Sequence, residues 1–242
     1  MRYPLIIIGS ILAAGCTSSS TELPLDIEGV PLRREVSSEG ITCILEGEYP
    51  RVREEESRKN VDSLNEILHE AINEAYVTGF QDCPELYRDM AEPGSSLTET
   101  TQFGFRVELN EQNLLSITHF ATHYLEGAAH PTNVLHAITL DTPSGEEYDL
   151  ASLFRSESPY QERITAIVER QMAMDDMEAS PEAWTNFDEW VFYFRPGYLV
   201  MGNFFNVHAL QAMQVAISLE EFTDIAREGG PILRLLEATP ST

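Results

Sequence analysis

Alternation of apolar and polar residues predicts most of the strands in this chain. In residues 41–49, the side chains of Ile41, Cys43 and Leu45 fall on one side, and Thr and Glu residues fall on the other. This period of two is typical of a strand with one buried face. The segments predicted to be strands, including a hairpin that turns at Pro196-Gly197, are 41–49, 103–109, 114–126, 134–141, 191–201 and 214–219.

Helical spacing of apolar residues predicts the remaining elements. Val61, Leu64, Leu68 and Ala75 recur on one side of a segment whose other side is acidic, and Gly79 is placed to end that helix. A short helix over 150–154 is predicted to be capped by Asp149, and a longer helix to begin at Ser158-Pro159 and reach about Met177. The other predicted helices are 61–75 and a terminal helix over 220–227. Residues 82–102 are predicted to be loop and short helix.

The order of these elements is strand, helix, strands, helix, strands, helix. Runs of neighbouring strands interrupted by single helices are typical of an α+β protein. We therefore expect one or more antiparallel sheets with helices packed on one face. A doubly wound parallel sheet would need regular alternation of strands and helices, which the pattern lacks.

The N-terminus predicts export and lipidation. Arg2 precedes an apolar run over residues 5–14, which is too short to span a bilayer as a helix, and the run ends in Ala-Ala-Gly-Cys16. This resembles the lipobox of bacterial lipoproteins, so residues 1–15 are predicted to be a signal peptide and Cys16 to carry lipid. Residues 16–31 would be the lipidated tether. The alternative is a secreted protein with a free Cys16.

Export also determines how the other cysteines are interpreted. Once Cys16 carries lipid, Cys43 and Cys83 are the two that remain. In an oxidising compartment, an even remainder favours a disulfide, although two buried thiols or half of a metal site are alternatives. Thr17, rather than Asp, follows Cys16. In a Gram-negative cell this favours the outer membrane, with the protein facing the periplasm.

The charge of the chain is strongly acidic. There are 40 Asp and Glu residues against 15 Lys and Arg residues, a formal net charge of −25. Such a surface repels nucleic acid and would attract a cationic partner, although adaptation to salt or simple solubility produces the same composition. The sequence has no Gly-rich phosphate loop and no nucleophile elbow, so it predicts no cofactor.

Histidines are the best candidates for metal ligands or catalytic residues in this sequence. His119 and His123 are four residues apart in a predicted strand and would point to the same face. A metal site would need a third ligand, for which His130, His136 and Asp141 are candidates. The alternative is that each histidine is a separate surface or capped residue, and we predict no metal.

The segment that follows these histidines is a constrained loop. Gly127, Ala128 and Ala129 are small, and Pro131 fixes the backbone after His130. Loops held by rigid strands often carry binding residues, although a plain strand connection is an equal alternative. The predicted ligand-binding residues are Tyr124, Gly127, Ala128, His130 and Pro131.

These residues resemble a known family. Residues 116–154 are similar to the core of the bacterial extracytoplasmic domain pair DUF4163 and DUF3298, which occurs in RsiV-type anti-sigma factors and beside the deacetylase domain of PdaC-type enzymes. The residues that match are Tyr124, Gly127, Ala129, His130, Pro131, Gly145, Leu153 and Phe154, whereas Ala128 departs from the second glycine of the loop. The resemblance implies a DUF4163-like part over 32–110 and a DUF3298-like part over 111–242, packed as one globular unit.

The resemblance also implies a function. In RsiV-type proteins this region binds lysozyme, a cationic protein. We therefore expect a non-catalytic, lipid-anchored envelope module that binds a lysozyme-like protein or a peptidoglycan fragment. The alternative is a metal-assisted cell-wall hydrolase that uses His119, His123 and His130. A third interpretation is a structural lipoprotein that assembles with other envelope proteins.

Overall fold

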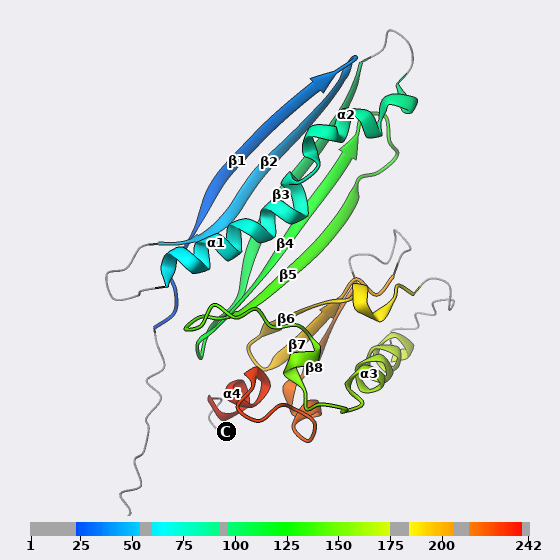
Figure 1. Cartoon of the computed structure of the whole chain (residues 1–242). Helices are drawn as coiled ribbons and strands as arrows, with labels where there is room; N and C mark the ends of the chain where they lie inside the picture. Colours follow the sequence, from blue (N-terminus) through cyan, green and yellow to red (C-terminus); the bar gives the residue numbers. More distant parts are fainter. Residues whose placement is uncertain (1–22, 54–59, 92–95, 175–183, 206–212, 239–242) are drawn as a thin grey trace, which may run out of the picture.

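Two β-sheets of different size organise the structure, a computed structural model that describes residues 23–53, 60–91, 96–174, 184–205 and 213–238 (Figure 1). The predicted signal peptide and Cys16 lie outside the described residues, as does the predicted end of a helix near Met177. The described residues include no helix that is long and apolar enough to span a bilayer.

The larger sheet has five strands in the order β1-β2-β3-β4-β5. All neighbouring pairs are antiparallel except β2 and β3, which are parallel, because a helical segment carries the chain back between them. The strands are β1 (Ile27–Ser38), β2 (Ile41–Val52), β3 (Leu97–Glu111), β4 (Leu114–Leu125) and β5 (Thr132–Asp141).

Helices cover one face of this sheet. The helix α1 (Val61–Ile72) buries Leu64 and Leu68 against Leu115 and Ile117 of β4, which are odd-numbered neighbours on one side of the strand. The chain continues through one π-turn, Asn73–Val77, before Gly79 adopts a left-handed φ of 80°. The segments that follow are the 3₁₀ turn Phe80–Asp82, α2 (Cys83–Leu86) and the 3₁₀ turn Arg88–Met90.

A second sheet packs against the opposite face, near the turn that joins β3 to β4. Leu109 and Leu114 share a core with Phe194, and the Phe194 backbone N–H donates to Ser116 Oγ at 3.0 Å. This three-stranded antiparallel sheet consists of β6 (Val191–Arg195), β7 (Tyr198–Gly202) and β8 (Gln214–Ser218). Its core also includes residues from α3 (Tyr160–Met174), α4 (Pro231–Ala238) and the 3₁₀ turns Ala151–Leu153, Phe187–Glu189 and Leu219–Phe222.

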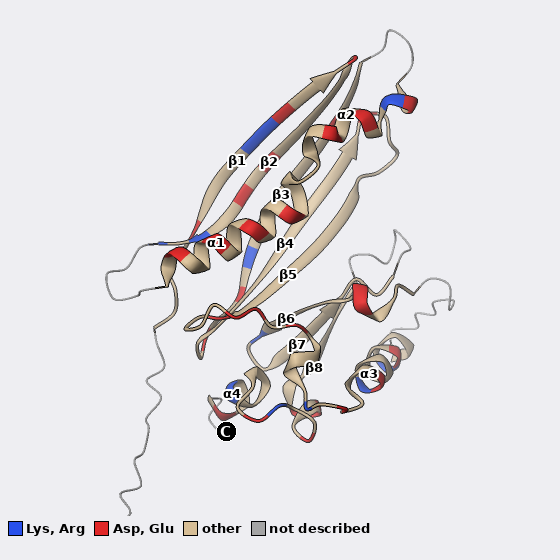
Figure 2. Cartoon of the chain, in the orientation of Figure 1, with Lys and Arg blue, Asp and Glu red and all other residues tan. Residues whose placement is uncertain are grey.

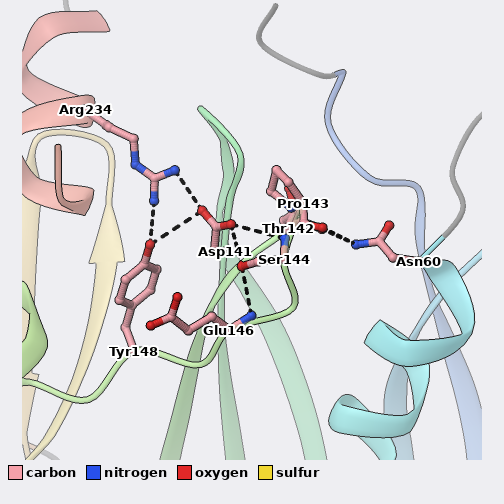
Figure 3. Close-up of polar contacts among 8 residues, drawn as sticks. All are labelled: Asn60, Asp141, Thr142, Pro143, Ser144, Glu146, Tyr148 and Arg234. Carbon is pink, nitrogen blue, oxygen red and sulfur yellow. Dashed lines mark hydrogen bonds and ion pairs between the residues drawn. The ribbon is translucent and has the colours of Figure 1, made fainter. Parts of the chain in front are cut away.

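The end of β5 joins the two layers (Figure 3). Arg234 of α4 donates from Nη1 to Asp141 Oδ1 at 2.8 Å and from Nη2 to the Tyr148 hydroxyl at 2.9 Å. Asn60, directly before α1, donates from Nδ2 to the Thr142 carbonyl at 2.6 Å. These contacts hold α1 and α4 to the same end of the sheet.

The α+β class is confirmed, and the structure corrects several details. The sheet is mixed and not purely antiparallel, because residues 97–102 form the part of β3 that pairs in parallel with β2. β1 begins at Ile27, inside the segment predicted to be tether, because its whole length finds partners along β2. The predicted parts 32–110 and 111–242 meet at the end of β3, and both contribute strands to the five-stranded sheet.

The C-terminal helix was also wrongly placed. Residues 219–222 form a 3₁₀ turn, and the α-helix begins only after Gly229 and Gly230, at Pro231. The left-handed φ of 66° at Gly229 ends the preceding turn, and proline suits the first position of the next helix.

Candidate functional site

The predicted disulfide is present and lies under the helices. Cys43 of β2 and Cys83 at the start of α2 are joined by an S–S bond of 2.01 Å, and both are buried. Their sulfurs and Glu99 form the one group of three metal-type ligand atoms within 4.8 Å of one another that the described residues contain. Because both sulfurs are oxidised, this group is a structural crosslink and not a metal site.

The predicted ligand-binding residues lie together at the β4–β5 hairpin. Tyr124 is 43% exposed near the end of β4, and the loop from Gly127 to His130 is exposed. Gly127 has a φ of 87°, a left-handed conformation that favours glycine, and the Ala128 N–H donates to the Leu125 carbonyl at 2.9 Å. Pro131 leads directly into β5.

Tyr124 also belongs to an open part of the sheet that sequence analysis did not identify. Along β4, Phe120, Thr122 and Tyr124 point away from the helices, and Phe120 is 47% exposed. The ring of Phe120 lies over Gly104 of β3, where a Cβ atom would come within 2.8 Å of the Phe120 Cζ atom. We call this surface the open face; it is defined by Pro31, Glu46, Glu48, Gln102, Phe120, Thr122 and Tyr124.

The open face is hollowed and rich in hydrogen-bonding groups. Most of its residues line a shallow groove of about 540 Å³. Gln102 donates from Nε2 to Glu46 Oε1 at 3.2 Å, and Thr122 donates to Asn133 Oδ1 at 2.9 Å. Exposed aromatic rings beside fixed polar groups are the usual composition of a recognition surface. The alternation along β4 places Phe120 and Tyr124 on the side opposite to Ile117 and His119, but it does not show which side the helices leave uncovered.

A second site lies on the helix-covered face, and we call it the histidine pocket. His119 of β4 is directly opposite His136 of β5, so the two imidazoles share one side of the sheet. They line a cavity of about 470 Å³ beneath α1 and the π-turn. The charged and titratable residues of the histidine pocket are Glu70, Glu74, His119, His136 and Glu147.

Burial and neighbouring charges shift the pKa values of three groups in the histidine pocket away from their usual values. Burial, and then the neighbouring His136, lower the pKa of His119 to about 4. Burial, and then His123, also lower the pKa of His136. Burial, and then the Glu74 carboxylate, raise the pKa of Glu147. Burial therefore favours the neutral imidazoles, and the charge of Glu74 disfavours ionisation of Glu147.

The three histidines of the predicted metal alternative are not brought together. His123 Nδ1 lies 2.7 Å from Thr101 Oγ1 and 3.6 Å from Glu99 Oε1, and His130 lies in the exposed loop. His119 instead faces His136. The pairing depends on strand register, and the glutamates come from distant segments, so no local sequence signal identified the histidine pocket.

Comparisons with known proteins show the fold. No protein-family model and no curated protein matches the sequence. The structure is similar to the crystal structure of a DUF3298 family member from Bacteroides fragilis, with a TM-score of 0.59, 14% identity, and coverage of 88% of this chain and 98% of the other. It is also similar to a DUF3298 family protein from Pseudomonas aeruginosa, with a TM-score of 0.61, 13% identity, and coverage of 87% and 96%. The chain therefore has the fold seen in DUF3298 family proteins.

Proposed function

We propose that this chain is a non-catalytic, lipid-anchored module of the cell envelope that binds a cationic, lysozyme-like protein on the open face and the adjoining loop. The observation that carries the proposal is the exposure of Phe120, which lines the groove, and of Tyr124 farther along the same face of β4. The loop from Gly127 to Pro131 extends this surface from the same hairpin.

The charge of the chain supports a cationic partner. Acidic side chains predominate on α1, whereas β1 carries both acidic and basic side chains (Figure 2), and the formal net charge is −25. Glu48 places a carboxylate in the groove beside Phe120, and Glu46 adds a second one that Arg33 already pairs. A basic protein would gain both long-range attraction and direct pairing with these groups. Its affinity should therefore fall as the salt concentration rises.

The alternative of a metal-assisted hydrolase receives no such support. It requires His119, His123 and His130 to act together, and the structure places them in three separate environments.

Calorimetric titration of the purified mature chain with lysozyme tests the proposal. Phe120→Ala and Tyr124→Ala should each weaken binding by about tenfold, because exposed aromatics contribute strongly at interface centres. Tyr198→Ala is the matched control, since Tyr198 is also 47% exposed but lies on β7. Binding of muropeptides without binding of lysozyme would replace the proposed partner with a cell-wall ligand. Absence of both would refute the proposal.

The lipid anchor needs its own test. In cells, Cys16→Ser should release the protein from the membrane fraction, because the proposed acyl chains could no longer be attached. Membrane fractionation with an antibody to the chain measures this directly. An unchanged membrane fraction in the variant would exclude Cys16 as the anchor.

A further inference from the structure

The histidine pocket has a feature that its packing does not explain. His119 is only 2% exposed, and neither of its ring nitrogens has a hydrogen-bond partner among the described residues. Buried polar side-chain atoms are normally satisfied, because leaving one without a partner costs free energy. A bound metal ion that accepts a lone pair from one ring nitrogen of His119 would remove part of this cost.

We propose that the histidine pocket binds one divalent transition-metal ion of the zinc type, with His119, His136 and Glu74 as its protein ligands. The site lies on the opposite face from the proposed protein-binding surface and is independent of it. It also differs from the trio of His119, His123 and His130, because Glu74 and His136, the latter one of the candidate third ligands, take the places of His123 and His130.

The two imidazoles are suited to share an ion. Residues directly opposite in an antiparallel pair have Cβ atoms about 4.5–5.5 Å apart, which lets two histidines converge on one metal. The Tyr76 ring contacts the His136 ring edge to face, with centroids 5.7 Å apart, and so restricts its orientation. Imidazole nitrogen is a preferred ligand of zinc.

The carboxylates supply the third ligand and the charge balance. Glu70, Glu74 and Glu147 surround the imidazoles, and no Lys or Arg lines the cavity among the described residues. A cation would therefore relieve the repulsion among the carboxylates. Glu74 is proposed as the third ligand because it lines the cavity from the π-turn Asn73–Val77 and is exposed, so its side chain has room to change rotamer.

The proposed ligand atoms are not yet close enough together to share one ion. The ligand atoms of His119, His136 and Glu74 do not all lie within 4.8 Å of one another. Binding therefore requires the Glu74 side chain to swing towards the imidazoles. Three protein ligands with a fourth position left for water is a common zinc arrangement.

Zinc titration of the metal-stripped mature chain tests the assignment. Calorimetry should show one ion per chain. His136→Ala and His119→Leu should each weaken zinc binding by about a hundredfold, and Glu74→Gln by about tenfold. His69→Ala is the matched control, because it removes an exposed imidazole from α1 whose ring contacts Tyr49, and it should leave zinc affinity unchanged.

A second measurement separates coordination from loss of folding. Cobalt bound to the wild-type chain should give the intense visible absorption of a four-coordinate site, and His136→Ala should abolish it while the circular dichroism spectrum stays native. Glu74→Gln changes an exposed side chain and should fold normally. The proposal is overturned if the wild-type chain binds no stoichiometric zinc, or if zinc affinity is the same in His119→Leu, His136→Ala and the wild type. Loss of zinc in His130→Ala instead would assign the ion elsewhere and also overturn it.

Discussion

The two faces of the five-stranded sheet differ although the same strands build them. On β4, Ile117 is fully buried under α1, whereas Phe120 and Tyr124 on the other side are 47% and 43% exposed. The covered face contains the disulfide and the helix-to-sheet core. Among the described residues, the second sheet packs on the opposite face near the β3–β4 turn. Alternation along a strand thus separates residues that stabilise the fold from residues available for recognition.

The largest expected effect is on the covered face. The double variant Cys43→Ala/Cys83→Ala removes a crosslink between residues separated by 40 positions, so the free energy of unfolding should fall by about 4 kcal/mol. Urea unfolding measures this loss. Lysozyme binding by the fraction that stays folded should persist. A loss below about 1 kcal/mol would mean that the disulfide does not organise this face.

The second-largest loss of stability is expected when a core side chain is truncated. Leu68 is fully buried between α1 and the sheet, so Leu68→Ala should lower the free energy of unfolding by about 3 kcal/mol. Phe120→Ala, on the open face, should cost less than about 1 kcal/mol. Denaturation midpoints of the two variants compare the faces directly. Equal losses would contradict the division of roles.

The junction where the layers meet should respond to acid. Burial would raise the pKa of Asp141, but hydrogen bonds from Ser144 and Arg234, together with the charge of Arg234, lower it overall. Because the folded-state pKa lies below the unfolded-state pKa of about 3.9, the stabilisation is present above that pH and is lost as pH falls through the folded-state pKa. Asp141→Asn should therefore reduce stability clearly near pH 6 and less near pH 3, as measured by urea unfolding. An equal effect at both pH values would show that this carboxylate does not carry the acid sensitivity.

The smallest effect on stability, less than about 1 kcal/mol, is expected for Gly104→Ala. The added Cβ would meet the far end of the Phe120 ring, which can move aside towards solvent. Lysozyme affinity should nevertheless fall several-fold, because the ring leaves its position in the groove. If calorimetry shows unchanged affinity, the Phe120 position does not define the binding surface.

Local sequence patterns predicted most of the helices and strands but not which strands pair with one another. The alternation in β4 and the helical spacing around Leu64 and Leu68 were sufficient to identify those elements. Strand β1 and residues 97–102 are rich in polar residues, so they have little local signal. Strand β1 pairs with β2, and residues 97–102 lie between β2 and β4. The disulfide followed from cysteine count and compartment.

The candidate sites show the same limit. The loop from Gly127 to Pro131 was visible as a motif, whereas the open face required knowledge of which side of β4 the helices leave uncovered. The pairing of His119 with His136 depends on the register between β4 and β5. The contribution of Glu74 depends on where the π-turn lies over the sheet.

Hydrogen exchange with and without saturating lysozyme tests the central claim most directly. The account predicts protection of backbone amides in the β4–β5 hairpin, over residues 120–133, and in the central part of β2, with α1 and α4 unchanged. Protection confined to α1, α3 or α4, or no protection at any position, would contradict the assignment of the open face as the binding surface.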